Sequence, residues 1–127
     1  MKKLILISMV IMLAFTSVQV FADYDSDTVV AVMRDNLSSM GALKSAVANS
    51  DFYEAAQAFM ALAEGSYKIK DFTPYRGTQA DWTATHEALI NAAFEGIGAC
   101  GLQDIDGVKT AMAKIGAFNK GGHGDHK

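Results

Sequence analysis

Apolar side chains recur at three- and four-residue spacing along this sequence, and this helical periodicity is the feature that most constrains the fold. Between Asp27 and Lys68 the chain contains no proline and only two glycines. The pattern predicts a first helix that begins near Asp27, a side chain suited to an N-cap. One face of this helix is expected to be buried and consists of Val29, Met33, Leu37, Met40, Leu43 and Val47.

A second helix is predicted to follow the break at residues 49–51. Asp51 and Glu54 have the three-residue spacing of a capping box. The side chains expected on its buried face are Phe52, Ala55, Ala56, Phe59, Met60, Ala63 and Tyr67. The first two helices are therefore joined by a short turn, which favours an antiparallel pair.

Two more helices are predicted beyond the longest connection, residues 68–79, which contains the only proline, Pro74. The third helix should begin near Asp81, with an inner face of Trp82, His86, Leu89, Ile90, Ala93, Ile97 and Cys100. The fourth follows the glycine and aspartates of residues 101–107, with Val108, Met112, Ile115 and Phe118 facing inward. No segment alternates as a half-buried strand does. The sequence therefore predicts an all-α, antiparallel up-and-down four-helix bundle.

Residues 1–22 have the pattern of a secretory signal peptide. Lys2 and Lys3 precede an apolar run, and cleavage is expected after Ala22. We therefore expect an exported, periplasmic protein with a bundle domain at 23–120 and a Gly/His tail at 121–127. Without Lys2 and Lys3, nine basic residues stand against fourteen acidic ones, a net charge of −5. An acidic chain without a basic run argues against nucleic acid and membrane partners.

Motifs typical of enzymes are missing from the sequence. It has no nucleophile elbow, Gly-rich phosphate loop or His-Glu-x-x-His sequence, and no Glu-x-x-His pair of the di-iron bundles. We therefore expect no catalytic activity. His86, on the inner face of the third helix, and Trp82 are interpreted as structural. Cys100, the only cysteine, is expected to be a buried small apolar residue.

The final residues, 119–127, contain two histidines among three glycines. On a helical wheel His123 lies close to the stripe of Met112, so its imidazole could coordinate a metal or haem iron. Alternatively, the glycines unravel the helix and leave the histidine in water, which the pattern alone favours. His123, Asp125 and His126 together could also capture a divalent metal ion.

Met33, in the first helix, offers a soft thioether ligand of the kind that, with a histidine, holds haem iron in some proteins. A methionine in an apolar stripe is more often a gap-filler in the core. Both interpretations of Met33 remain open on the pattern alone.

Several motifs resemble the cytochrome c prime and cytochrome b-562 superfamily, across nearly the whole exported chain. The segment AVMRDNLSSMGALKSAV at 31–47 resembles the family's first helix, with Met33 at the distal position. FTPYRG at 72–77, followed by Trp82, resembles the family's loop before a third-helix tryptophan. The last helix of the c-type members closes on Cys-x-x-Cys-His, and the corresponding residues here are Asn119, Lys120, Gly121, Gly122 and His123.

The resemblance implies two alternatives. Asn119 and Gly122 replace both thioether cysteines, so covalent haem c attachment at this motif is excluded. The chain would instead hold haem b non-covalently between Met33 and His123, for electron transfer with a redox partner protein or for binding a small gas. Alternatively, the bundle has lost haem and serves as a structural, partner-binding or metal-binding module. A helix-face homodimer is a further expectation of the resemblance.

Overall fold

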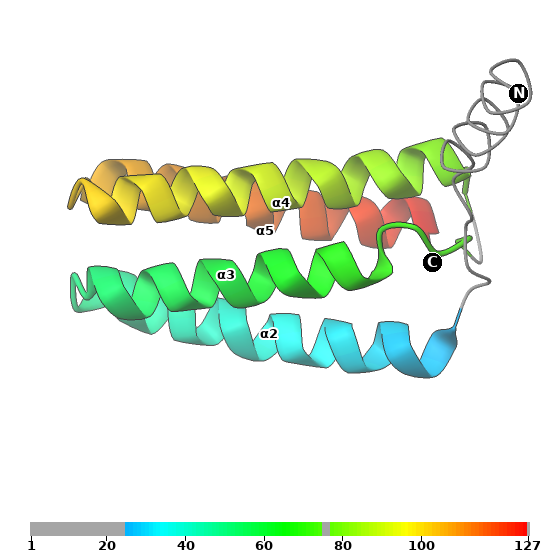
Figure 1. Cartoon of the computed structure of the whole chain (residues 1–127), viewed down its shortest axis with the longest axis horizontal. Helices are drawn as coiled ribbons and strands as arrows, with labels where there is room; N and C mark the ends of the chain where they lie inside the picture. Colours follow the sequence, from blue (N-terminus) through cyan, green and yellow to red (C-terminus); the bar gives the residue numbers. More distant parts are fainter. Residues whose placement is uncertain (1–24, 75–76, 127) are drawn as a thin grey trace, which may run out of the picture.

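The structure is a computed structural model that describes residues 25–74 and 77–126, with side chains described as far as Phe118. The predicted signal peptide, residues 1–22, lies outside the described residues. Four helices form the described part: α2 (Ser26–Ala48), α3 (Phe52–Ile69), α4 (Gln79–Gly101) and α5 (Ile105–His126). They run alternately up and down in a single antiparallel bundle (Figure 1). This confirms the predicted all-α four-helix bundle.

The two ends of the bundle differ in construction (Figure 1). We call one the turn end, because it holds the short turns at 49–51 and 102–104. The opposite end, called here the loop end, holds the start of α2, the longer connection at 70–78 and the end of α5. The candidate ligand residues of the sequence therefore belong to the loop end, because Met33 lies in the first turns of α2 and His123 in the last turn of α5.

Both turns at the turn end have the same design. In the first, the N–H of Ser50 donates to Val47 O and the N–H of Asp51 donates to Ala46 O, the pattern of a Schellman motif. In the second, Gln103 donates to Cys100 O and Asp104 donates to Ala99 O. Each aspartate then accepts from a backbone N–H of the next helix, Asp51 from Glu54 at 3.1 Å and Asp104 from Gly107 at 3.0 Å. The predicted cap at Asp51 is confirmed.

Two predicted helix starts are corrected by the structure. The N-cap of α2 is Asp25, whose carboxylate accepts from the N–H groups of Asp27 and Thr28 and from the Thr28 hydroxyl. These hydrogen bonds hold the pKa of Asp25 below its usual value. The N-cap of α4 is Thr78, which accepts from the N–H of Asp81 at 3.1 Å. Asp25 and the predicted cap Asp27 are both competent capping residues, so the pattern alone chose the wrong one for α2. Helix α4 begins at Gln79, two residues before the start predicted near Asp81.

The main core lies between the turn end and the middle of the bundle and draws on all four helices. Seven of its fourteen buried members are alanines, so the helices can approach closely; the larger members are Leu43, Phe59, Leu62, Leu89, Val108 and Ile115. The closest approach joins α3 and α4, where a Cβ atom at Gly96 would lie 2.4 Å from Phe59 Cζ. Cys100 is buried here as predicted, and burial raises the pKa of its thiol.

Four side chains predicted in the buried faces of the first two helices are exposed instead. Met33 and Leu37 on α2, and Met60 and Tyr67 on α3, all face solvent to a substantial degree. The buried positions of α2 are Val29, Val32, Leu43 and Ala46, so the inner face is rotated from the predicted stripe towards α3. In a four-helix bundle each helix buries an arc rather than its whole apolar surface, and the arc depends on where the neighbours lie.

Candidate functional site

The loop end is closed by its own small apolar cluster, separate from the main core. Val29 and Val32 of α2, Ile69 at the end of α3 and Trp82 of α4 are all buried, and Phe72 packs against them. We call these five residues the end cluster. Helices α2, α3 and α4 each contribute a side chain that the other two cover. The start of α2 is therefore held against the α3–α4 pair at this end.

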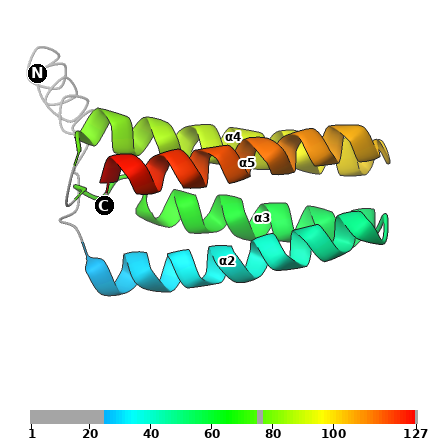
Figure 2. The ribbon, with the colours of Figure 1, turned by 180° about the vertical axis from the view of Figure 1, so that it is seen from behind.

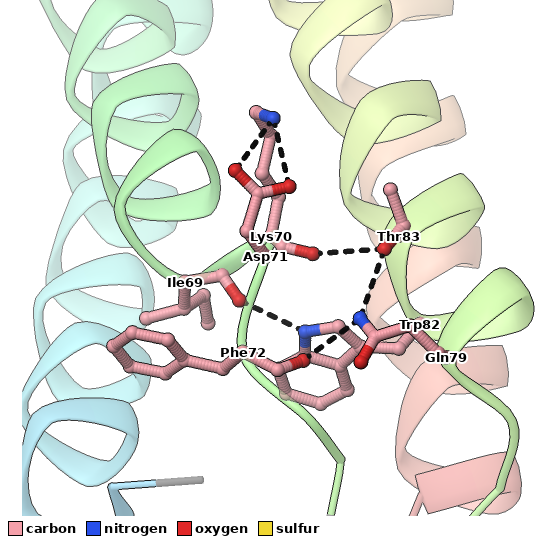
Figure 3. A network of polar contacts seen from close by, with 7 residues as sticks. All are labelled: Ile69, Lys70, Asp71, Phe72, Gln79, Trp82 and Thr83. Atoms are coloured by element: carbon pink, nitrogen blue, oxygen red, sulfur yellow. Dashed lines mark hydrogen bonds and ion pairs between the residues drawn. The ribbon is translucent and has the colours of Figure 1, made fainter. Parts of the chain in front are cut away.

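Side chains of α4 hold the end of α3 and the connection that follows it (Figure 3). Trp82 Nε1 donates to Ile69 O at 2.8 Å, and Thr83 Oγ1 donates to Lys70 O at 3.0 Å. Gln79 Nε2 donates to Phe72 O at 3.0 Å and lies 3.2 Å from Thr83 Oγ1. Ile69 O also accepts from the N–H of Phe72 at 3.1 Å, so the indole is its second donor. The Thr83 and Gln79 side chains satisfy the carbonyls of Lys70 and Phe72, which would otherwise need water. We call this network the α3–α4 clasp.

Next to the end cluster, on the side towards the middle of the bundle, two polar side chains join α3 and α4. Ser66 is fully buried, the one buried polar or charged side chain among the described residues. Its hydroxyl lies 3.3 Å from His86 Nδ1, and the His86 ring makes an edge contact with Trp82 at 4.5 Å between centroids. The interpretation of His86 as an inward-facing residue packed on Trp82 fits this geometry. Sequence reasoning missed Ser66, although its place three residues after Ala63 on the buried stripe could have indicated it.

Met33 lies to one side of the surface of α2 that faces α3. The flank facing α3 is marked by Val32 and Asn36, which sit against Gly65 so closely that a Cβ there would lie 2.7 Å from Asn36 Oδ1. Met33 lies about 100° from Val32 and about 60° from Asn36 around the helix, so it lies outside the contact that these two residues make with α3. Its side chain is 40% exposed. The thioether is therefore not absorbed into the core as a gap-filler.

Helices α2 and α5 pack only loosely against each other. Each consecutive pair of helices packs extensively, whereas α2 and α5 make few contacts in the described part of the chain. Val30 and Leu37 flank Met33 on the same side of α2 and are 50% and 76% exposed. A row of three exposed apolar side chains thus lies on one side of α2, outside its contact with α3.

The backbone of α5 is helical as far as His126, across Gly121, Gly122 and Gly124. Helical geometry therefore extends over residues that the sequence assigned to a tail. Figure 2 shows the last turn of α5 at the same end of the bundle as the first turns of α2. The side chains of His123, Asp125 and His126 lie outside the described residues, so both proposals that use them, haem ligation and metal capture, stay predictions.

The donor set at the loop end suits a soft or borderline metal centre better than a hard one. A thioether on α2 and an imidazole on α5 are ligands for haem iron or copper, and they do not favour calcium or magnesium. Among the side chains described, no group of three His, Cys, Asp or Glu residues could hold a metal ion. By donor chemistry, the residues at Met33 and His123 fit haem iron.

No family model, curated protein or solved structure matches this chain. The class of protein is therefore defined by the fold alone, as an all-α four-helix bundle. Within residues 25–74 and 77–126, no helix is both long enough and apolar enough to cross a membrane.

Proposed function

We propose that this chain is an exported, non-enzymatic four-helix bundle that binds haem b at its loop end, with Met33 and His123 as the residues that would hold its iron. The observation that carries the proposal is the placement of Met33. It is a partly exposed thioether in the loop-end half of α2, outside the contact with α3, and α5 ends at the same end of the bundle. Bound haem would supply one-electron chemistry at iron, or a site for a small gas if the Met33 bond opened.

The residues around Met33 have the properties that such a site needs. Val30 and Leu37 are exposed apolar side chains that would cover the hydrophobic porphyrin on the α2 side. The end cluster, on the buried side of α2, would exclude water from that side of the site. A dry, apolar surround favours retention of a non-covalent porphyrin and affects the potential of its iron.

Titration of purified protein with hemin tests the proposal. We expect a saturable one-to-one complex with a sharp Soret band and low-spin α and β bands on reduction. Met33→Leu keeps the apolar volume but removes the sulfur, so the complex should become high-spin. His123→Ala should abolish tight binding. The matched control is Met60→Leu, since Met60 is exposed to nearly the same degree, 39%, but lies on α3; its spectrum should stay low-spin.

Trp82 provides a second signal, independent of the iron ligands. It is the only tryptophan in the chain and belongs to the end cluster. Haem bound at the loop end should quench its fluorescence with the same midpoint as the Soret change. Absence of a one-to-one spectrum, or a spectrum unchanged in both ligand variants, would contradict the proposal.

A second candidate, a haem-free bundle with a structural or partner-binding role, is favoured by one observation. The buried members of the end cluster cover one another, so side chains of α2, α3 and α4 themselves close this part of the bundle. This candidate expects cooperative melting without cofactor and no shift on adding hemin. A specific ligand at about 100 times its Kd would instead add about 2.7 kcal/mol to the free energy of unfolding. Melting curves with and without hemin therefore separate the two candidates.

A further inference from the structure

Three apolar side chains form a continuous row on the surface of α2. Val30, Met33 and Leu37 are three and four residues apart and lie within an arc of about 60° around the helix. They are 50%, 40% and 76% exposed, and we call them the α2 row. No charged residue falls within this arc between Ser26 and Gly41. The α2 row is therefore an uninterrupted apolar surface that begins near the loop end.

The exposed side chains of α3 offer a poorer apolar surface. Tyr53, Met60 and Tyr67 are seven residues apart, so about 10 Å of helix separates each from the next. Two of the three carry a hydroxyl group, and Lys70 Nζ lies 5.3 Å from the centroid of the Tyr67 ring. An apolar segment of protein therefore gains more by covering the α2 row than by covering these residues.

The sequence before α2 contains a second apolar element, which matches the α2 row in length. Residues 4–15, which lie outside the described residues, include one polar side chain, Ser8. These twelve residues would be about 18 Å long as a helix, and Leu37 also lies about 18 Å along α2 from Asp25. The apolar run belongs to the predicted signal peptide, so it is present only in the precursor.

The apolar run can reach the α2 row from its own place in the chain. Residues 16–24 separate it from Asp25, the N-cap of α2. Nine extended residues span up to about 30 Å, which is more than the distance along α2 from Asp25 to Leu37. A short covalent linker gives an effective concentration on the order of millimolar. Residues 4–15 therefore meet the α2 row far more often than they meet another molecule.

We propose that, in the precursor, residues 4–15 fold back along α2 and cover the α2 row until the signal peptide is removed. This segment also keeps haem out, a consequence that rests on the proposed function, because Met33 and its apolar neighbours belong to the proposed haem site. The segment and haem exclude each other. Cleavage after Ala22 releases the segment, so haem binds to the exported chain and not to its precursor.

Thiol labelling without hemin tests the docking. Met33→Cys is made in the full chain and in residues 23–127, and its reaction with N-ethylmaleimide is followed by mass spectrometry. The thiol should react about tenfold more slowly in the full chain, because the tethered segment covers it. Met60→Cys is the matched control, since Met60 is exposed to nearly the same degree, 39%, but lies on α3; its rate should be equal in both chains. Cys100 is buried and should react slowly in both.

Substitutions in the segment test which residues cover the α2 row. Ile11→Asp places a charge in the middle of the apolar run and should restore fast labelling of Met33→Cys in the full chain. Thr16→Asp places the same charge outside the run and should leave the thiol protected. Equal labelling of Met33→Cys in both chains, or an equal slowing at Met60→Cys, would overturn the proposal. So would protection that disappears on dilution, because it would assign the covering segment to another molecule.

Hemin titration tests the consequence for the haem site. The full chain should bind hemin about tenfold more weakly than residues 23–127, and Ile11→Asp should remove the difference. Equal affinities while the α2 row is protected would overturn the exclusion of haem by the segment. If neither chain binds hemin, the proposed function fails, whereas the labelling rates still decide whether the segment docks.

Discussion

Two residues at the turn end adopt a backbone conformation that glycine would adopt more easily. Ser50 and Gln103 have φ angles of 52° and 55°, in the left-handed region, and each occupies the C′ position of a Schellman motif. Glycine is the usual residue at this position because it has no Cβ to crowd the preceding carbonyl. Both residues are exposed, so nothing in the packing demands their side chains.

Gln103→Gly should therefore stabilise the protein. The expected gain is up to about 1 kcal/mol in the free energy of unfolding, since the relieved left-handed strain exceeds the extra entropy of an unfolded glycine. Urea unfolding followed by circular dichroism measures it. The control is Gly77→Ala, where φ is 85° and the sign should reverse. A Gln103→Gly protein that unfolds at lower urea concentration than the parent would contradict this account of the turn.

At the scale of the helices, the packing of α3 against α4 includes a close contact between Gly96 and the ring of Phe59. The three ring atoms of Phe59 nearest to a Cβ at Gly96 would lie 2.4 to 2.6 Å from it, and Phe59 is itself fully buried. The ring cannot move without disturbing the main core.

Gly96→Ala should destabilise the fold by about 1–3 kcal/mol, because the added methyl overpacks the core. Gly98→Ala is a matched control two residues away in the same helix, where a Cβ would meet nothing within 4 Å. Helix propensity alone should then stabilise the protein by up to about 1 kcal/mol. Thermal melting of the two variants measures both effects. Equal shifts in the same direction would show that α3 and α4 do not pack as described.

The α3–α4 clasp leads to a second prediction at the scale of the helices. Trp82→Phe keeps an aromatic ring in the end cluster but removes the donor to Ile69 O. Ile69 O keeps the N–H of Phe72 as a donor, so losing the indole donor should cost about 0.5–1.5 kcal/mol, and the gap left by the smaller ring should add to this loss. Asp71→Asn is the control, because the Lys70–Asp71 pair is partly exposed and should contribute less than about 1 kcal/mol. A Trp82→Phe change no larger than the Asp71→Asn change in urea unfolding would remove the clasp as a stabilising element.

For the molecule as a whole, the number, order and approximate limits of the helices could be predicted from periodicity, caps and the single proline. The fold follows from these because four amphipathic helices with short turns have few ways to cover their apolar faces. The exposure of Met33 and Leu37 could not be predicted in this way. A helical wheel shows that Val32 and Met33 are both close to the apolar stripe, and only the position of Gly65 on α3 decides which of them is buried.

For the candidate site, too, only part could be predicted from the sequence. Met33 and His123 could be proposed from residue type and position, because ligand chemistry is local to a side chain. The end cluster, Ser66 and the α3–α4 clasp could not, since each joins residues that are distant in sequence. Ser66 and His86 are twenty positions apart, and Trp82 and Ile69 are thirteen. Their association depends on the register of two helices, which periodicity leaves free.

The arrangement of the loop end also determines where an affinity tag should be placed. The start of α2 and the end of α5 lie together at this end, opposite the two short turns (Figure 2). An affinity tag fused before α2 or after α5 would therefore lie at the loop end, and a polyhistidine tag would bring extra imidazoles close to the proposed haem site. For any spectroscopic work the tag should be removed or inserted at the Ser50 turn, where it cannot become a ligand.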